Sequence, residues 1–528
     1  MIRRNKSKGH ARTKAQAHLF KTFLNILSLT LQRPRNPKFI FLTNLQRMVG
    51  MDPTMLDNIQ QMRCFFLSPA QESHELQVHF PRYNRVNHRN TSLNGLVIKK
   101  SKLAIQGPNI IISNKKMCTH RYIKYTIFYQ TMRVLFHYTH KQTLGHTTRS
   151  IALVEALCRQ KAEVLLLQGG LPQPFIRFPK DCKVLDIPFP FDDRGSFQTH
   201  AVPVSAAKRS EFILKTAINF VPDVFITEFF PFGRLAYLPE LLPTLRYLRK
   251  KGTRIIASIG YPLLIDLDRL KEPTFAAMHR AVFAFFDKFL IHTPDQLETS
   301  YIHDSIQSPV LSRSYAKVMD DLKKRIIYTG YVFPGKMITG GTPLSTLKDT
   351  KNTIVVSRGG GAVYPKIITL AITAQRLLDK GLQTVIACGP ASTPKEMALF
   401  QSCLKPKDKG RVILANHLDS LQDLLRSCPV SVSLCGYNTS IQLMRYGTPS
   451  VIIPYQNNLS QVSTNDQIAR SRLLQEHFSS IILNHESMTA KSLADAITKQ
   501  MSSPRPKPAP SAWFNGADVS ANVIVNGP

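Results

Sequence analysis

Residues 433–455, SLCGYNTSIQLMRYGTPSVIIPY, set the expected fold of the C-terminal half of this chain. An apolar strand leads into a glycine turn, a short helix and a second apolar strand. Gly436 permits the turn, and we expect Asn438 or Thr439 to cap the helix, with Gln442 completing a capping box. The segment therefore predicts one strand–helix–strand unit of a parallel sheet.

Both ends of this helix carry further information. Gly447 is expected to end it, because glycine readily takes the left-handed conformation found at helix C-termini, and Pro449 cannot continue a helix. At the other end, the N–H groups of the first turn have no partners within the helix and favour an anion. The turn at Gly436 is thus a candidate anion site.

On both sides of this unit, apolar strands alternate with helical patterns from Met132 onward. Each strand is apolar at nearly every position, which is typical of parallel sheets covered on both faces. The series predicts an α/β fold of two Rossmann-like, doubly wound domains that face a cleft, with ligands at the carboxyl ends of the strands. The predicted strands cover residues 133–138, 163–170, 223–229, 254–260, 288–294 and 325–330, then 353–357, 383–389, 411–416, 430–434 and 449–455.

Composition places the expected boundaries between these parts. The stretch between the two series contains Pro334, Pro343 and three glycines, which is typical of a linker. The C-terminal stretch begins with the Pro-rich MSSPRPKPAPSAW and ends in residues that we expect to form a short helix. The predicted organisation is a basic N-terminal extension (1–131), a first α/β domain (132–330), a linker (331–350), a second α/β domain (351–500) and a Pro-rich tail with a terminal helix (501–528).

Basic residues are concentrated at the N-terminus. The net charge is +35, and residues 1–131 hold 22 Lys and Arg against 4 Asp and Glu, about half of the excess. Such a stretch is typical of a nucleic-acid or membrane-surface arm or a transit peptide; a poorly defined, disordered extension, or a start assigned upstream of Met132, would look the same. No RNA- or DNA-binding motif accompanies it, so we predict no nucleic-acid partner and assign it no function.

The eight cysteines form no C-x-x-C pair, so neither a zinc site nor a disulfide framework is expected. No apolar run reaches 18 residues, and no transmembrane helix is predicted. These features favour a cytoplasmic protein. Its basic surface leaves peripheral contact with an anionic membrane open, although solvated lysines explain the charge equally well.

The turn HKQTLGHTTRS follows the first strand of the first domain. Gly145 permits a tight turn, and Thr147 or Thr148 is expected to cap the following helix. His146 then lies at the entrance of that helix, where a side chain with an ordinary pKa of about 6.5 suits a general base. A surface histidine in a loop would show the same spacing. No G-x-G-x-x-G occurs here, so the dinucleotide fingerprint is absent.

A glycine triplet follows the first strand of the second domain, in VVSRGGGAVYP. We expect Gly359, Gly360 and Gly361 to open a helix and to bring their N–H groups close to a phosphate, with Arg358 adding positive charge. The missing G-K-[ST] excludes a P-loop, and a flexible turn is the alternative. With the turn at Gly436, the domain has two candidate anion sites, which predicts a ligand that contains a diphosphate.

The segment GYNTSIQLMRYGTPSVIIPY, followed by TNDQIARSRLL, resembles the donor-binding segment of glycosyltransferases with the GT-B architecture. The resemblance is closest to the family 28 C-terminal domain, the group of the bacterial N-acetylglucosaminyltransferase that makes lipid II. A narrower match is a set of predicted bacterial-type glycosyltransferases related to that enzyme. Further blocks recur in order over about 132–475: MRVLFHYTHKQTLGHTTRSIALVEAL, DVFITEFFPFGRLAYLPELLP, YTGYV and VSRGGGAVYP. Nothing in residues 1–131 resembles the family.

The resemblance implies a role for each candidate residue. The first domain would hold the acceptor and the second a nucleotide-sugar donor. His146 matches the family's loop histidine beside the acceptor and is the first candidate for the base, with Glu228 the second. Gly145 and Arg234 would lie on the acceptor side. The implied donor contacts are Arg358, Gly359, Gly360, Gly361, Gly436, Tyr437, Asn438, Thr439, Gln442, Asp466 and Gln467.

Two positions depart from the family pattern. Gln442 stands where the family usually has a Glu that holds the ribose hydroxyls, and an amide carries no charge. The segment ASIGYPLL lacks the Arg-Asp pair that relatives tend to carry after the serine. Altered specificity and lost activity are both compatible with these departures.

The resemblance implies an inverting, metal-independent hexosyltransferase that moves a sugar from a nucleotide-diphospho-sugar to an acceptor hydroxyl. No cofactor is expected, because the nucleotide sugar is a co-substrate, and a lipid-linked molecule and a saccharide both remain open as the acceptor. Helix N-termini and glycine-turn amides would stabilise the leaving diphosphate. Two alternatives remain: a non-hydrolysing sugar-nucleotide epimerase, which would need several carboxylates in the cleft, and a catalytically degenerate GT-B binding protein.

Overall fold

The structure is a computed structural model of the chain. It describes residues 110–113, 126–129 and 131–527, with gaps at 141–143, 171–172, 174, 189–201, 233–236, 261–281, 298–316, 318–319, 334, 336–340, 343–348, 362, 419 and 456–464. The chain divides into two units, Met1–Tyr129 and Gln130–Pro528. In the first unit, β1 (Ile110–Ser113) pairs antiparallel with β2 (Thr126–Tyr129).

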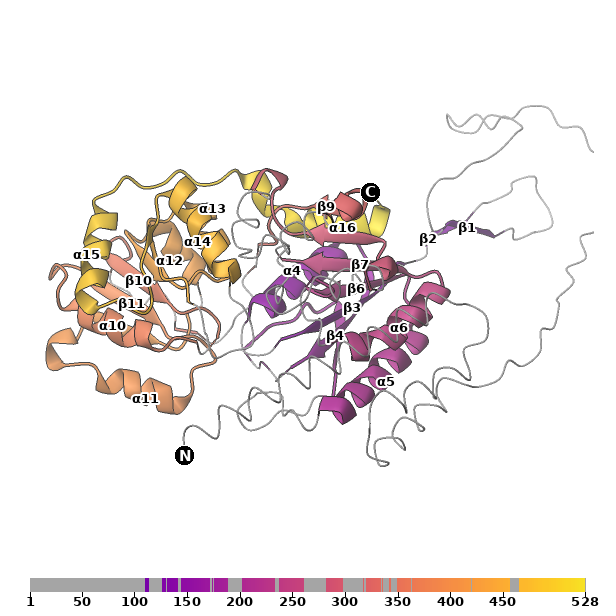
Figure 1. The fold of residues 1–528 in the computed structure, drawn as a ribbon, viewed down its shortest axis with the longest axis horizontal. Coiled ribbons are helices and arrows are strands. Elements are labelled where there is room, and N and C mark those ends of the chain that lie inside the picture. The colour runs from indigo at the N-terminus through magenta and orange to yellow at the C-terminus, as the bar shows by residue number, and fades with distance from the viewer. Residues whose placement is uncertain are drawn as a thin grey trace, which may run out of the picture. The chain divides into compact units, whose positions relative to one another are not determined.

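The second unit contains two parallel sheets, and the larger has seven strands in the order β5-β4-β3-β6-β7-β8-β9 (Figure 1). Its strands are apolar at most positions, as burial on both faces requires. They are β3 (Arg133–Thr139), β4 (Glu163–Gly169), β5 (Cys182–Asp186), β6 (Val224–Glu228), β7 (Arg254–Ile259), β8 (Lys288–Ile291) and β9 (Ile326–Tyr328). The accompanying helices are α4 (Gly145–Arg159), α5 (Val202–Phe220) and α6 (Leu238–Lys250), with 3-10 turns at Phe283–Phe285, Asp295–Leu297 and Lys323–Arg325.

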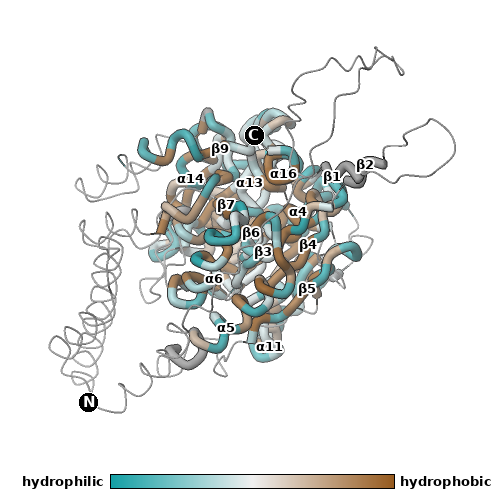
Figure 2. The backbone as a smooth tube through the Cα atoms, turned by 90° about the vertical axis from the view of Figure 1, so that its right-hand side faces the viewer, coloured by the Kyte–Doolittle hydropathy of each residue, from teal (hydrophilic) through white to brown (hydrophobic). Residues whose placement is uncertain are grey.

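The alternation of side chains along β3 separates the two faces of this sheet. Val134 and Phe136 belong to a core cluster that includes residues of α4 and of the C-terminal helix α16 (Gly516–Asn526). On the other face, Thr139 accepts a hydrogen bond from Arg209 of α5, which pairs with Glu240 of α6. Figure 1 shows α5 and α6 side by side, and in Figure 2 hydrophobic colours dominate the central strands of this sheet.

The smaller sheet has six parallel strands in the order β12-β11-β10-β13-β14-β15. Its core is apolar and separate from that of the larger sheet. The strands are β10 (Thr353–Ser357), β11 (Gln383–Ala387), β12 (Val412–Ala415), β13 (Ser431–Ser433), β14 (Ser450–Ile452) and β15 (Ile481–Ile482). The helices are α10 (Lys366–Gln375), α11 (Pro394–Ser402), α12 (Leu421–Ser427), α13 (Tyr437–Tyr446), α14 (Asn465–Phe478) and α15 (Ala490–Met501), with 3-10 turns at Pro406–Asp408 and Ser511–Phe514.

These two sheets confirm the expected α/β fold with two Rossmann-like parts. After the smaller sheet the chain returns to the larger one, where α16 packs against α4. Arg254 of β7 donates a hydrogen bond to the carbonyl of Ile524 at 2.6 Å, which fixes the returning helix against the sheet. Among the described residues, no helix is both long and apolar enough to span a membrane.

The structure corrects the expected helix caps. Helix α13 begins at Tyr437 with Gly436 as its N-cap and without a side-chain capping bond, so the predicted capping box is wrong. Helix α4 begins at Gly145, ahead of the threonines expected to cap it. Gly447 does end α13, with a left-handed φ of 57°. Both helices therefore begin with backbone N–H groups that no side chain of the cap satisfies.

Candidate active site

Polar residues follow the carboxyl edge of the larger sheet on the face that α4 covers. Val224 and Ile226 of β6 belong to the core cluster with α4, and the two-residue period places Glu228 on the same face. Neighbouring strands repeat the pattern, each with a polar residue in the last position on this face. The row is Gln168, Tyr138, Glu228, Ser258, His292 and Thr329. Because parallel strands end at the same edge, the row concentrates hydrogen-bonding groups under the start of α4.

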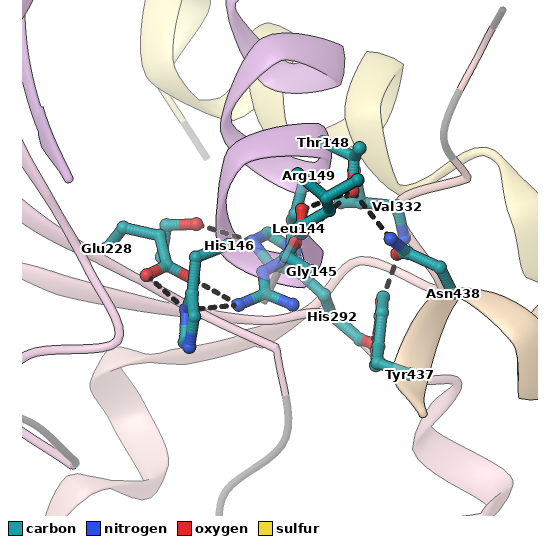
Figure 3. Close-up of polar contacts among 11 residues, drawn as sticks. Leu144, Gly145, His146, Thr148, Arg149, Glu228, His292, Val332, Tyr437 and Asn438 are labelled. Atoms are coloured by element: carbon teal, nitrogen blue, oxygen red, sulfur yellow. Dashed lines mark hydrogen bonds and ion pairs between the residues drawn. The ribbon is translucent and has the colours of Figure 1, made fainter. Parts of the chain in front are cut away.

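His146, the second residue of α4, pairs with Glu228 (Figure 3). Its Nδ1 lies 2.8 Å from Oε2 and 3.0 Å from Oε1 of the carboxylate. A carboxylate only accepts hydrogen bonds, so Nδ1 carries the hydrogen and Nε2 the lone pair. The His146 side chain is 16% exposed and that of Glu228 is 1% exposed. A reachable imidazole oriented by a buried carboxylate has the geometry of a general base.

Two neighbours complete this pair. Phe229 follows Glu228 with a φ of 62°, unusual for a residue with a side chain, and its ring meets that of His146 edge-on at 5.5 Å. Arg149, one turn along α4, forms an ion pair with Glu228, and its Nη2 lies 3.3 Å from His146 Nδ1. Gly260 leaves the space for this arginine, because a Cβ there would lie 2.6 Å from Nη1.

The charges of this group fix the ionisation of Glu228. Burial by itself raises the pKa of a carboxyl, but the charges of His146 and Arg149 and the hydrogen bonds from both outweigh it and lower the pKa of Glu228 to about 2. So acidic a carboxyl is a weak proton acceptor near neutral pH. Of the two predicted bases, the geometry therefore favours His146, with Glu228 as its orienting partner.

His292, just past β8, lies deeper in the same row. Its Nε2 is 2.8 Å from Ser258 Oγ and its Nδ1 is 2.9 Å from Thr329 Oγ1. Burial and the nearby charge of Arg149 lower the pKa of His292 to about 3, against a smaller opposing influence of Glu228. This imidazole is therefore neutral at neutral pH and has a structural position behind the His146–Glu228 pair.

The first turn of α13 contacts this edge. The Tyr437 hydroxyl donates to the carbonyl of His292 at 3.1 Å and accepts from the backbone N–H of Val332 at 3.3 Å. Asn438 Nδ2 donates to Thr148 Oγ1 of α4 at 2.6 Å. Tyr437 and Asn438, both predicted donor contacts, thus join the two sheets in this structure (Figure 3).

The amide of Asn438 has a defined orientation. The Thr148 hydroxyl donates to the carbonyl of Leu144 at 3.0 Å, so it must accept from the Nδ2 of Asn438. The Oδ1 of Asn438 is then a buried acceptor with no hydrogen-bond partner among the described residues. Among the described side chains in the first turn of α13, no other buried N or O atom lacks a hydrogen-bond partner.

The side chain of Arg358 is buried and directed into its own domain. Its guanidinium is 1% exposed and bonds to the carbonyl of Cys388, to Ser392 Oγ at 2.7 Å and to Glu396 at 3.2 Å, and it lies over the ring of Phe400. These contacts hold the turn after β10 against the turn after β11. These contacts give Arg358 a structural role in this structure, and its predicted contact with the donor stays a prediction.

The glycine triplet follows β10 but does not open a helix, because α10 begins only at Lys366. Gly359 has a φ of +81°, which a residue with a side chain rarely adopts. A Cβ on Gly360 would lie 2.5 Å from Leu144 Cγ, at the start of α4. At Gly360, the structure supplies a packing reason for glycine beside the predicted approach of a phosphate.

The remaining candidates lie around the start of α13 and α14. Thr439 and Gln442 are buried at 8% and 7% exposure, and Gly145 is the first residue of α4. Gln467 accepts a hydrogen bond from the backbone N–H of Tyr455 at 3.0 Å. Asp466 lies in the first turn of α14, but its side chain is outside the described set, and Arg234 falls in the gap at 233–236.

Sequence reasoning missed Arg149, Ser258, His292 and Thr329. The sequence does contain a signal for Ser258, His292 and Thr329. In each apolar strand of the first series, the last position on one face is polar and follows an apolar residue on that face. Arg149 lies three residues after His146, the spacing that puts two side chains on one face of a helix. Within the described ranges, no group of three or more His, Cys, Asp and Glu could hold a metal ion.

Known proteins resemble this chain to different extents. Residues 353–521 match the family model for the glycosyltransferase family 28 C-terminal domain. No curated protein matches the chain. Among solved structures, the glycosyltransferase of kitacinnamycin is 14% identical with a TM-score of 0.49, covering 75% of this chain and 98% of its own. CalG4, the calicheamicin glycosyltransferase, is 13% identical with a TM-score of 0.47, and the match covers 75% of this chain and 95% of CalG4. MurG of Acinetobacter baumannii is 11% identical with a TM-score of 0.43, and the match covers 75% of this chain and 96% of MurG.

The family match is therefore to a domain of glycosyltransferases. It covers residues 353–521, about a third of the chain. That domain holds every donor contact that the sequence predicted, including the first turn of α13. The likenesses to solved structures lie below a TM-score of 0.5 and add nothing about its substrates.

Proposed function

We propose that this chain transfers a sugar from a nucleotide-diphospho-sugar to an acceptor hydroxyl, with inversion and without a metal ion. The observation that carries the proposal is the His146–Glu228 pair at 2.8 Å. It lies at the start of α4, the helix that Asn438 of the family 28 domain contacts. The proposed base is thereby in contact with the domain that we propose binds the donor, and transfer to a hydroxyl requires such proximity.

The proposed step is a single displacement. Nε2 of His146 takes the proton of the acceptor hydroxyl while the hydroxyl oxygen forms a bond to the anomeric carbon. The bond between that carbon and the donor phosphate oxygen breaks, and its electron pair leaves with the nucleoside diphosphate. Attack opposite the leaving group inverts the anomeric centre. The carboxylate of Glu228 stabilises the imidazolium that forms.

The leaving diphosphate gains charge as this bond breaks, so fixed dipoles that face it lower the barrier. The backbone N–H groups in the first turn of α13 have no capping side chain and lie at the positive end of the helix dipole. The turn with Gly359, Gly360 and Gly361 follows the neighbouring strand β10. The buried Oδ1 of Asn438 would accept a hydrogen bond from a hydroxyl group of the nucleotide-sugar donor.

Metal independence needs a direct test, because the sequence contains one D-x-D spacing. Asp266 and Asp268 form it, in the gap at 261–281. Carboxylates in that spacing bind the divalent cation of many phosphate-containing ligands. The full-length chain should therefore be assayed with EDTA and, separately, with Mn²⁺.

The test of the proposal is a donor panel. The full-length chain is incubated with UDP-, GDP- and dTDP-sugars, together with saccharide and lipid-linked acceptors. Thermal shift, nucleoside diphosphate release and the anomeric configuration of the product by NMR are measured. We expect one nucleotide to raise the melting temperature and one acceptor to give an inverted product, undiminished by EDTA.

Each part of the proposal can fail separately. The absence of any thermal shift or release across the panel would refute the transferase function. Release that EDTA abolishes and Mn²⁺ restores would refute metal independence alone. A retained configuration would refute the single displacement. Turnover confined to vesicles with a lipid-linked acceptor would support peripheral contact with a membrane, and turnover in solution would remove the need for it.

A further inference from the structure

Arg149 connects the His146–Glu228 pair to the first turn of α13. Its guanidinium forms an ion pair with Glu228 on one side, and on the other its Cζ lies 5.0 Å from the ring centroid of Tyr437. The Arg149 side chain is only 4% exposed. One side chain therefore contacts both the partner of the proposed base and the donor-side helix (Figure 3).

Tyr437 is itself held firmly at this contact. Its hydroxyl donates to the carbonyl of His292 and accepts from the N–H of Val332. Burial raises the pKa of Tyr437 to about 12, so the hydroxyl keeps its hydrogen at neutral pH. The bond from Asn438 to Thr148 fixes the same turn of α13 on α4. The ring that faces Arg149 consequently has a defined place.

The chemistry of this position suits arginine better than lysine. A planar guanidinium can pair with a carboxylate through its edge while an aromatic ring covers its face, whereas a lysine ammonium cannot do both in one geometry. The ring of Tyr437 keeps water from the guanidinium, which strengthens the pairing with Glu228. Removal of that ring would expose the ion pair and loosen the carboxylate that orients His146.

We propose that Arg149 is a positioning residue that makes the orientation of the His146–Glu228 pair depend on docking of the first turn of α13. The inference rests on the proposed function and extends it. His146 is oriented to accept the proton of the acceptor hydroxyl only when the first turn of α13, which faces the donor, lies against α4. Orientation of the base and docking of the donor-side turn are thereby coupled through one side chain.

The kinetic test compares variants on both sides of the contact. We expect Arg149→Gln to lower kcat by about 10²-fold while the KM for the donor changes little, because orientation of the base is lost and donor contacts remain. Arg149→Lys should recover part of the loss by restoring the charge. Tyr437→Leu should lower kcat by about 10-fold, and Tyr437→Phe by less, since phenylalanine keeps the ring. Arg159→Gln, an exposed arginine on the same helix, is the control and should match the wild type.

The pH profile distinguishes positioning from simple structural damage. Burial raises the pKa of Glu228, and His146 and Arg149 together outweigh it and lower that pKa. Removal of Arg149 therefore lets Glu228 hold a proton at higher pH, and a protonated carboxyl no longer fixes the hydrogen on Nδ1 of His146. We expect the acid limb of kcat against pH to move to higher pH in Arg149→Gln and to return toward the wild type in Arg149→Lys.

A double variant tests the coupling itself. If Arg149 acts through Tyr437, the pair Arg149→Gln and Tyr437→Leu together should lose no more activity than Arg149→Gln alone. Losses that multiply would overturn the proposal, as would a raised donor KM with an unchanged kcat. Tyr437→Leu keeps both charged partners of the ion pair, so its kcat and the tautomer of His146 still test the proposal if Arg149→Gln does not fold.

A spectroscopic measurement separates this inference from the proposed function. The full chain labelled with ¹⁵N-histidine gives nitrogen shifts that report the tautomer, and His146→Gln assigns the His146 signal. We expect hydrogen on Nδ1 in the wild type and a mixed tautomer in Tyr437→Leu. An altered tautomer without turnover of any nucleotide sugar would refute the proposed function alone. Turnover with the same tautomer in both proteins would refute the coupling alone.

Discussion

The carboxyl edges of the two parallel sheets differ in what they present. At the edge of the larger sheet, His146, Arg149 and Glu228 form a group of charged and titratable side chains that are at most 16% exposed. At the edge of the smaller sheet, the turns consist of glycines and helix N-termini, and the one arginine beside the triplet, Arg358, is directed into its own domain. The carboxyl edge of a parallel sheet thus presents charged side chains in one half of the molecule and glycine turns with helix N-termini in the other.

The difference matches what each half of the proposed transfer reaction needs. Proton transfer requires a side chain with a lone pair at a fixed place, and buried charges around His146 provide the fixation. A departing diphosphate requires donors that do not reorganise, and backbone N–H groups of α13 fit that requirement without a formal charge. Variants at the two edges should therefore fail in different kinetic parameters.

The largest effect is expected at the first edge. His146→Ala should lower kcat by about 10²–10⁴-fold and leave the KM for the donor within a small factor, because only proton transfer is lost. Steady-state rates of nucleoside diphosphate release measure this split. His477→Ala removes an imidazole from an exposed position on α14 and is the control. Equal turnover in His146→Ala and the control would remove His146 from the mechanism.

The sequence predicted the architecture well for a physical reason. Apolar strands that alternate with helices leave few ways to bury both faces of a sheet, so two Rossmann-like parts followed from periodicity alone. Strand β5 is not among the predicted strands, because CKVLD is short and carries the charged residues Lys183 and Asp186 at the edge of the sheet. The sequence pattern also predicts no element for Val202–Phe220, which forms α5.

Site prediction was less complete, because the residues that matter are brought together by the fold. His146 and Glu228 are 82 positions apart and were predicted separately, but their pairing was not. Arg358 carries a charge beside a glycine turn, and no local pattern shows that Cys388 and Ser392 take its donors. The role of Arg149 follows only from the structure, in which Glu228 and Tyr437 lie on either side of its guanidinium.

An effect of intermediate size is expected on stability in acid. Burial raises the pKa of Glu228, but His146 and Arg149 lower it to about 2, below its ordinary value of 4.5. A depressed carboxyl pKa stabilises the folded state above pH 4.5, and the stabilisation is lost as pH falls toward 2. The difference corresponds to about 3 kcal/mol. Urea unfolding of the wild type and Glu228→Gln should differ by about that much at pH 7 and converge near pH 2.

An exposed pair sharpens this test. Glu163 pairs with Arg133 at 3.2 Å but its side chain is 54% exposed. Such pairs contribute about 0–1 kcal/mol, so Glu163→Gln should lie near the wild type at every pH. A gap for Glu228→Gln that stays constant from pH 7 to pH 2 would show that packing, and not the charge of the carboxylate, stabilises this edge.

The smallest effect is expected where the two edges meet, at Gly360. A Cβ there would lie 2.5 Å from Leu144 Cγ, so Gly360→Ala should cost about 1–3 kcal/mol through overpacking and raise the KM for the donor by several fold. The variant Leu144→Ala makes room for that methyl group. If glycine is needed for packing, the double variant should recover donor KM and melting temperature relative to the sum of the single changes. If it is needed for close approach of a phosphate, donor KM should stay raised in the double variant, and the second edge would then be a phosphate site at Gly360 as well as at α13.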